Sequence, residues 1–449
     1  MNRPCHTAHS VLTTMQISPG WKRLLLYLGL LAGFIGFIWL QAIFEPENFY
    51  RRDFTADYLP AKACLAGINP YTPLPELAKQ FAFPLPTDLF RHPTPHSPGL
   101  LLLSTPIGLV SYRTANLVWI GFSLLCLLLA ILLLLREFGV TKSCVWALAL
   151  SWMALGYGPL TADLGTGQID PWLLLLAVGM WLAWRRERQW LGGVLLGGAL
   201  ALKLLAWPFV VFLLLRRQWR ALFGAGLTVG AVHLLALAVF GFAAVRDYYL
   251  KVGPQVGQLY RGYFSNLALT SWGWRLFQGT GEALELAPHV LVEPLYASAT
   301  LARIFSLLLP LLLLAVTLWL AWRVRQFDTS FMLLLCASLL LGPISWFHYL
   351  TVLILPIGLL AQRLLHNHAL PSLRRAALVL ALLTALPHHV IIGLALHFGT
   401  PLTASKITTL PFAASLIATL PTFFVLGWMA LLWRTDGAPE TRLELSQPA

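Results

Sequence analysis

Charged residues are scarce in this sequence. They make up 11% of its 449 residues, apolar residues make up 58%, and the mean hydropathy is +0.73. This composition lies outside the range of soluble globular domains and within that of proteins with many membrane spans. It excludes an ordinary water-soluble domain and predicts an all-α polytopic membrane protein.

Acidic residues are the rarer charge, with 18 Asp and Glu against 31 Lys and Arg, so the formal net charge is +13. The basic residues form short clusters between apolar runs and are not gathered on one domain. Such a distribution is typical of cytoplasmic loops under the positive-inside rule. We therefore expect membrane lipids around the chain and no nucleic acid as a partner.

Cysteine is also sparse, with five residues and no CxxC pair, so neither a disulfide framework nor a zinc site is indicated. No HExxH motif occurs, and the histidines at 92, 96, 388 and 389 lack the spacing of a convergent ligand set. We expect no cofactor and no structural metal, and we leave open a loosely bound divalent cation. No internal repeat is visible.

Long apolar runs dominate what is present. A full span needs about 20 residues, and we identify about twelve apolar segments. The first is too long for the core of a signal peptide and predicts an uncleaved span. The segments lie at 24–44, 114–135, 144–160, 171–184, 190–203, 204–215, 221–242, 301–322, 329–346, 349–364, 374–395 and 412–433.

Three apolar stretches are too short to span on their own. Segments 190–203 and 204–215 predict partial helices that meet inside the membrane at Lys203. The stretch 98–112 is interrupted by Pro106 and Gly108 and predicts an interfacial or re-entrant helix.

Orientation follows from the loops. If the N-terminus is cytoplasmic, Lys and Arg clearly outnumber Asp and Glu on the cytoplasmic side of the membrane. On the other side, basic and acidic residues are equally numerous. We expect a cytoplasmic N-terminus, one transmembrane domain, a cytoplasmic tail and three outer loops. These segments are 1–23, 24–434, 435–449, and the loops 45–113, 161–170 and 243–300.

The first outer loop carries two acids, Asp53 and Asp57, which share one face if 53–66 is helical. A carboxylate near apolar groups has a raised proton affinity, which suits a general base. The alternative is an interfacial salt-bridge cluster with the neighbouring basic residues.

Two candidate cations lie in apolar surroundings. Lys203 inside a hydrophobic segment costs about 2.5–3.5 kcal/mol on insertion scales, which favours an anionic partner such as a phosphate. His348, beside Trp346 and Tyr349 at the end of a span, can donate a hydrogen bond to a phosphate or sugar. The alternatives are a snorkelling lysine and an interfacial histidine.

Four further polar residues are candidate ligands of a sugar. Gln168 and Asp170 end the sequence TADLGTGQID, which is otherwise a polar turn. Asn266 and Arg275 lie in an outer segment that interleaves aromatic and basic residues, the pattern of an aromatic belt with interfacial arginines.

Several of these residues fall in short motifs. DFTADYLPAKACLAGINPY at 53–71 resembles the D-F-x-x-Y-x-x-A-x-x-x-L-x-G-x-x-P-Y opening of glycosyltransferase family 87. His96-Ser97-Pro98 stands where that family has Y-P-P, and Asp57 where it usually has Tyr. Further matches in family order are GQID at 167–170, similar to G-Q-x-N, the glycine-rich run that ends at Lys203, and PISWFHY at 343–349.

The resemblance implies a GT-C fold and a polyprenyl-phosphate sugar donor, most often mannose. It implies an acid of the first outer loop as general base, which selects Asp53, with Asp57 as the second choice. A catalytic role for His348 and a phosphate-binding role for Lys203 are consistent with this chemistry. The remaining expected substrate-binding residues are Asp57, Tyr58, His96, Gln168, Asp170, Asn266, Arg275 and Trp346.

We therefore expect a multi-pass enzyme of a bacterial inner membrane. It moves a hexose to a glycolipid or glycan acceptor on the extracytoplasmic face, with inversion at the anomeric carbon. The competing hypothesis is a transporter or lipid flippase, since many spans and an intramembrane lysine fit that class too.

Overall fold

The computed structural model describes residues 19–86, 91–286, 288–366, 371–402 and 407–436. Most of the expected cytoplasmic N-terminus and tail lies outside these ranges. The α-helices are α1 Pro19–Gln41, α2 Pro46–Phe49, α3 Thr55–Leu65, α4 Leu74–Gln80, α5 Pro98–Ser104, α6 Tyr112–Glu137, α7 Ser143–Ala154, α8 Gly158–Thr166, α9 Asp170–Arg185, α10 Gln189–Leu202, α11 Trp207–Leu215, α12 Trp219–Asp247, α13 Gly253–Tyr260, α14 Leu269–Phe277, α15 Ala299–Arg323, α16 Phe327–Ser338, α17 Ile354–His366, α18 Pro371–Ala385, α19 His388–His397, α20 Phe412–Ala418 and α21 Leu420–Arg434.

Six short turns of 3-10 or π type join these helices, and three strands complete the fold. They are η1 Ala42–Phe44, η2 Thr105–Leu109, η3 Leu204–Ala206, η4 Tyr248–Val252, η5 Gly281–Glu285, η6 Phe347–Leu353, β1 Val290–Glu293, β2 Thr400–Pro401 and β3 Thr408–Pro411.

The expectation of about twelve membrane-spanning helices is not confirmed. Within the described residues, five helices are long and apolar enough to cross a membrane, or up to eight if each of three sharply bent helix pairs is one span. The bent pairs are α7–α8, α18–α19 and α20–α21, with bends of 77°, 82° and 59°. A proline stands at or next to the start of each second helix, where its missing N–H and fixed φ prevent one continuous helix.

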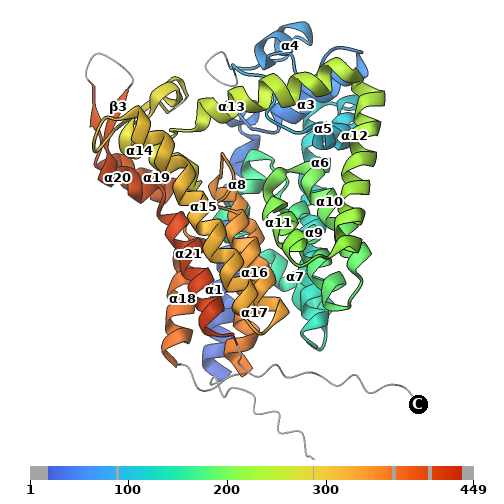
Figure 1. Cartoon of the computed structure of the whole chain (residues 1–449), viewed down its shortest axis with the longest axis vertical. Coiled ribbons are helices and arrows are strands. Elements are labelled where there is room, and N and C mark those ends of the chain that lie inside the picture. The colour runs from blue at the N-terminus through green and yellow to red at the C-terminus, as the bar shows by residue number, and fades with distance from the viewer. Residues whose placement is uncertain (1–18, 87–90, 287, 367–370, 403–406, 437–449) are drawn as a thin grey trace, which may run out of the picture.

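The chain is not purely helical either. Strand β3 pairs in parallel with β1, in the register Val290↔Thr408, and antiparallel with β2. One face of this small sheet packs on α19 and α20 through a separate apolar cluster that includes Val292, Leu410 and Ala414. Figure 1 shows the sheet with α14, α19 and α20 beside one upper corner of the helical bundle.

The predicted break near Lys203 is present. α10 ends at Leu202, Lys203 has an extended backbone with φ −153° and ψ 125°, and η3 then leads into α11. The stretch 98–112 also forms the expected short helix, α5, which continues as η2 from Thr105 to Leu109. At the break near Lys203, the hydroxyl group of Ser97 donates to the carbonyl oxygens of Ala201 and Leu202.

The two long loops of the sequence lie at the same end of the bundle. In Figure 1, α3, α4 and α5 of the first loop lie at the top together with α13 of the second. The first loop is thus folded into helices, of which α5 packs on α10 and α12, and its turn η2 packs on α6. This cap brings its polar residues against the ends of α8 and α10.

Candidate active site

Arg52 attaches the first loop to α8. Its guanidinium donates to the carbonyl oxygens of Leu164 at 2.5 Å and Gly165 at 2.7 Å, and Phe54 N–H donates to Thr166 O at 3.0 Å. The last carbonyls of a helix have no partner within it, so these bonds both complete α8 and hold the loop. Burial lowers the pKa of Arg52 to about 10, so it stays protonated near neutral pH. Asp53 is thereby placed beside the end of α8.

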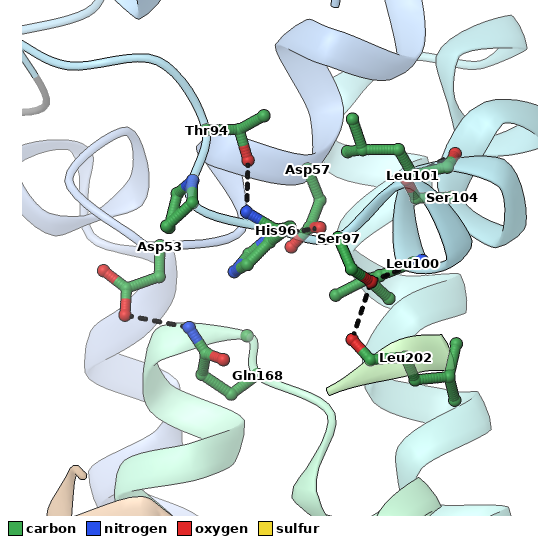
Figure 2. A network of polar contacts seen from close by, with 12 residues as sticks. Asp53, Asp57, Thr94, His96, Ser97, Leu100, Leu101, Ser104, Gln168 and Leu202 are labelled. Atoms are coloured by element: carbon green, nitrogen blue, oxygen red, sulfur yellow. Dashed lines mark hydrogen bonds and ion pairs between the residues drawn. The ribbon is translucent and has the colours of Figure 1, made fainter. Parts of the chain in front are cut away.

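Asp53 is half-buried and accepts a hydrogen bond from Gln168 Nε2 at 3.1 Å, as Figure 2 shows. Asp53 therefore faces the interior of the site with part of its surface still accessible.

Asp57 differs from Asp53, and the two acids do not share a helix face. α3 begins after Asp53, so only Asp57 belongs to it. Asp57 is 1% exposed and pairs with His96 Nδ1 at 2.7 Å. Burial raises the pKa of the Asp57 carboxyl, and the facing His96 partly offsets this. Within the described residues neither acid forms an ion pair with Arg51, Arg52 or a lysine, which disfavours a surface salt-bridge cluster.

A second polar cluster lies at the broken helix. Lys203 Nζ is 3.2 Å from Asp170 Oδ1, and His348 Nδ1 is 2.5 Å from Asp170 Oδ2. Asp163 Oδ2 accepts from the backbone N–H of Asp170 at 3.0 Å and lies 4.0 Å from His348 Nδ1. α8, the first turn of α9, the end of α10 and η6 thus bring two carboxylates and two basic groups together in a buried position.

These carboxylates and His348 also meet a geometric condition for a cation site. One ligand atom from each of Asp163, Asp170 and His348 lies within 4.8 Å of the others. In this arrangement Lys203 already compensates Asp170, and a positive charge next to the site disfavours a metal ion. The expectation of no structural metal stays a prediction.

Lys203 also borders an apolar cavity. Its ammonium lies 3.6 Å from the ring centroid of Tyr349, a cation–π contact. The cavity is formed by α9, α10, α11, α16 and η6, and Lys203 is its one charged lining residue among those described. Apolar lining residues include Leu173, Ala177, Met180, Ala199, Phe209 and Leu335.

Aromatic rings form one wall near Asp53. Trp346 packs edge-on against Tyr260 and Tyr263, with ring centroids 5.3 and 5.6 Å apart. His92 Nε2 lies 3.0 Å from the Tyr260 hydroxyl, which ties the first loop to the end of α13. Trp346, an expected substrate-binding residue, therefore lies in this wall.

Three expected ligand residues do not join the site. Asn266 uses its amide on Tyr260 O, Pro343 O, Ala268 N and Ser345 N, so its hydrogen-bonding groups brace the backbone. Arg275 is 1% exposed and donates to Phe264 O at 2.5 Å. Tyr58 donates to Val110 O at 2.9 Å from within the core. We assign all three to structural support because their polar atoms serve the fold.

Sequence reasoning missed three members of the site. Asp163 lies within the quoted TADLGTGQID, but its proximity to His348 depends on the bend before α9. The contacts of Arg52 with α8 and of Tyr349 with Lys203 depend on packing that no local pattern indicates. The one signal for Asp163 in the sequence is its position seven residues before another acid, Asp170.

Comparison with known protein families finds a match. The sequence model of glycosyltransferase family 87 matches residues 95–345. This range contains Gln168, Asp170 and Lys203, but it begins after Asp53 and ends before His348.

The curated relatives found are arabinofuranosyltransferases. An alpha-(1->3)-arabinofuranosyltransferase of Mycobacterium tuberculosis (strain H37Rv) is 36% identical over 155 residues, which is 33% of this chain and 36% of the relative. A protein of the same name from Corynebacterium glutamicum is 28% identical over 180 residues, 39% and 42% of the two chains. The chain thus spans less than half the length of these relatives. No solved structure matches it significantly.

The family model covers more than half of the chain, and the motifs that resemble the family recur around the two polar clusters. The chain is therefore a member of glycosyltransferase family 87.

Proposed function

We propose that this protein transfers a sugar from a polyprenyl-phosphate donor to a glycan or glycolipid acceptor at the outer face of a bacterial inner membrane. The observation that carries this proposal is the position of Asp53, half-buried at one end of the bundle and linked through Gln168 to the turn that leads into Asp170. The carboxylate of Asp53 and the polar cluster around Asp170 and Lys203 therefore lie on either side of the turn between α8 and α9.

Asp53 acts in this proposal as the general base. It is the more accessible of the two loop acids, whereas the carboxylate of Asp57 is engaged by His96. Removal of the proton of the acceptor hydroxyl by Asp53 makes the oxygen a better nucleophile. A single displacement of the phosphate then inverts the anomeric carbon.

Lys203 and His348 bind the departing phosphate. Charge develops on its oxygens as the glycosidic bond breaks, and the preorganised ammonium of Lys203 stabilises that charge, with the imidazole of His348 beside it. Asp170 holds both groups in place before the donor binds.

The proposal also names the kind of sugar that is transferred. The family resemblance alone favours mannose, but the relatives named above are arabinofuranosyltransferases. We therefore propose a pentofuranosyl donor in preference to a mannosyl donor.

The test is transfer by purified protein in detergent or liposomes, supplied with radiolabelled polyprenyl-phosphate arabinofuranose or polyprenyl-phosphate mannose. Acceptors are short alkyl glycosides and lipids extracted from bacterial envelopes. We expect transfer from the arabinofuranosyl donor, and Asp53→Asn lowers it by about 10²- to 10⁴-fold without changing the melting temperature. Glu76→Gln, an exposed acid of the same loop, is the matched control and keeps wild-type activity.

Transfer at the wild-type rate by a folded Asp53→Asn protein contradicts the assignment of the base. Transfer from the mannosyl donor alone contradicts the assigned sugar. Flux of either labelled lipid across liposomes without any transfer supports the transporter hypothesis instead.

A further inference from the structure

The Asp57–His96 pair has no role in the reaction outlined above. Both residues depart from the family motif at positions that are 39 residues apart in the chain, and the structure brings them into contact at 2.7 Å. The two departures therefore form one unit. A buried carboxylate paired with an imidazole is costly to bury and needs a physical explanation.

The backbone of His96 is held on both sides. Tyr71 Oη donates to His96 O at 3.1 Å, and His96 N–H donates to Thr94 Oγ1 at 3.3 Å. The next residue, Ser97, donates from its hydroxyl to Ala201 O and Leu202 O at the end of α10. His96 is thus a rigidly placed side chain, which is the requirement for precise recognition of a ligand.

One ring nitrogen of His96 is available to bind a ligand, because the other contacts Asp57. An ionised Asp57 accepts only, so Nδ1 of His96 carries the proton that it donates. Nε2 is the remaining ring nitrogen, it has no partner among the described residues, and it can hydrogen-bond a hydroxyl group, which both donates and accepts. Figure 2 shows this nitrogen directed away from Asp57, into the space bordered by Asp53 and Gln168.

The surroundings of this space favour a sugar over an anion. Figure 2 shows the carboxylate of Asp53 and the amide of Gln168 at the border of this space. A carboxylate beside this nitrogen repels an oxyanion, whereas a hydroxyl group can hydrogen-bond to both.

We propose that His96, oriented by Asp57, binds through Nε2 a hydroxyl group of the acceptor sugar next to the hydroxyl that Asp53 deprotonates. This inference rests on the proposed function, because it assigns a second contact to the acceptor at the same site. His96 would select acceptors that carry a hydroxyl group at that position, since an analogue without it leaves a nearly buried polar atom unpaired. Asp57 is a positioning residue.

The experiment uses the full-length protein in detergent with two families of acceptor probes. They are octyl arabinofuranoside and octyl mannoside, each with its set of monodeoxy analogues. Transfer kinetics give KM and kcat for acceptor and donor, and calorimetric titration of the same glycosides measures binding without transfer. The variants are His96→Ala, His96→Gln, Asp57→Ala and the double variant. His233→Ala removes a hydrogen-bonded histidine from α12 and is the matched control.

We expect the wild type to lose about 10- to 100-fold in kcat/KM with one monodeoxy analogue. His96→Ala loses a similar factor with the complete acceptor, mainly in KM, and no longer distinguishes that analogue. The donor KM is unchanged. Asp57→Ala has a smaller effect in the same direction, and it adds little in the double variant because both changes remove one unit. His233→Ala behaves as the wild type.

The proposal is overturned if a folded His96→Ala protein still discriminates against every deoxy analogue as the wild type does, or if its defect lies in the donor KM. If His96→Ala does not fold, His96→Gln, which keeps a polar side chain, decides by the same criterion. If the wild type transfers no sugar, the proposed function fails. Calorimetric titration of the glycosides then tests the role of His96 separately. If His96→Ala no longer distinguishes the complete glycoside from its deoxy analogue, binding of the hydroxyl group by the Asp57–His96 pair is supported.

Discussion

At the scale of single residues, identical side chains acquire different roles from their surroundings. Asp53 and Asp57 are four positions apart, yet one is half-buried beside Gln168 and the other is sealed against His96. Asp170 is likewise no isolated acid, because Lys203 and His348 both contact it. The chemistry of each carboxylate thus depends on its partners and accessibility.

Replacement of Lys203 tests the buried ion pair between Lys203 and Asp170. Among the described residues, Lys203→Met leaves the buried Asp170 with His348 as its one basic partner, and breaking a buried pair costs about 3–5 kcal/mol. We expect this loss in the free energy of unfolding, measured by denaturant titration in detergent. Asp170→Asn in the same background restores part of it, because the uncompensated charge is gone.

The matched control is Lys251→Met, which removes the exposed partner of Asp247 on η4. An exposed pair contributes about 0–1 kcal/mol, so this variant stays close to the wild type. Equal stability of the Lys203 and Lys251 variants would refute a structural role for the buried pair.

At the scale of elements, the turn between α8 and α9 connects the two polar clusters. Gly167 has φ +81°, a left-handed conformation that suits a residue without Cβ. A Cβ at this position would lie 2.6 Å from Cβ of Phe54 and 3.2 Å from Arg52 Nη2. Trp119 Nε1 also donates to Gly167 O at 2.8 Å. The turn therefore holds the first loop, and Asp53 with it, in place.

Gly167→Ala is expected to move this loop. The left-handed conformation costs about 1–2 kcal/mol for an L-residue, and the contact with Phe54 displaces the segment that carries Asp53. A displacement of about 1 Å at a reacting group lowers a rate by about 100-fold. The measurement is kcat for sugar transfer together with the melting temperature.

Gly165→Ala is the control, because its added Cβ meets nothing within 4 Å and its backbone is not left-handed. This variant keeps its activity. If Gly167→Ala is as active as Gly165→Ala, the turn does not position Asp53.

At the scale of the whole molecule, the fold is a bundle of long and broken helices with a helical cap at one end (Figure 1). Both long loops contribute to the cap and to the site. Their common location agrees with the distribution of basic residues along the chain. The orientation of the bundle in the membrane then decides on which side sugar is transferred.

Cysteine labelling tests that orientation. Cys144 is exposed at the start of α7, on the side that we expect to be cytoplasmic, and Leu295 is exposed in the second outer loop. In a background with Cys5→Ser and Cys64→Ser, a membrane-impermeant maleimide is expected to label Cys144 in inverted vesicles only. With Cys144→Ser and Leu295→Cys, it labels intact spheroplasts. The reverse pattern would place the site on the cytoplasmic side.

The sequence by itself determined the features that depend on local composition. Apolar runs indicate a membrane protein, the charged and proline-rich segment after the first run indicates an outer loop, and the short apolar runs on either side of Lys203 indicate a broken helix. Motif order was sufficient to identify the family. These properties follow from neighbouring residues, so no long-range contact is needed to infer them.

Only the tertiary structure decided how many apolar runs are continuous helices and which polar residues meet. Sharp bends divide three helix pairs, and the small sheet joins segments more than a hundred residues apart. Asp57 meets His96, and Asp170 meets His348, because segments far apart in the chain pack together. Asn266 and Arg275 resemble ligands in the sequence, but their polar atoms are used by the fold. Pairing of polar groups in a buried site depends on long-range packing, which local sequence patterns do not encode.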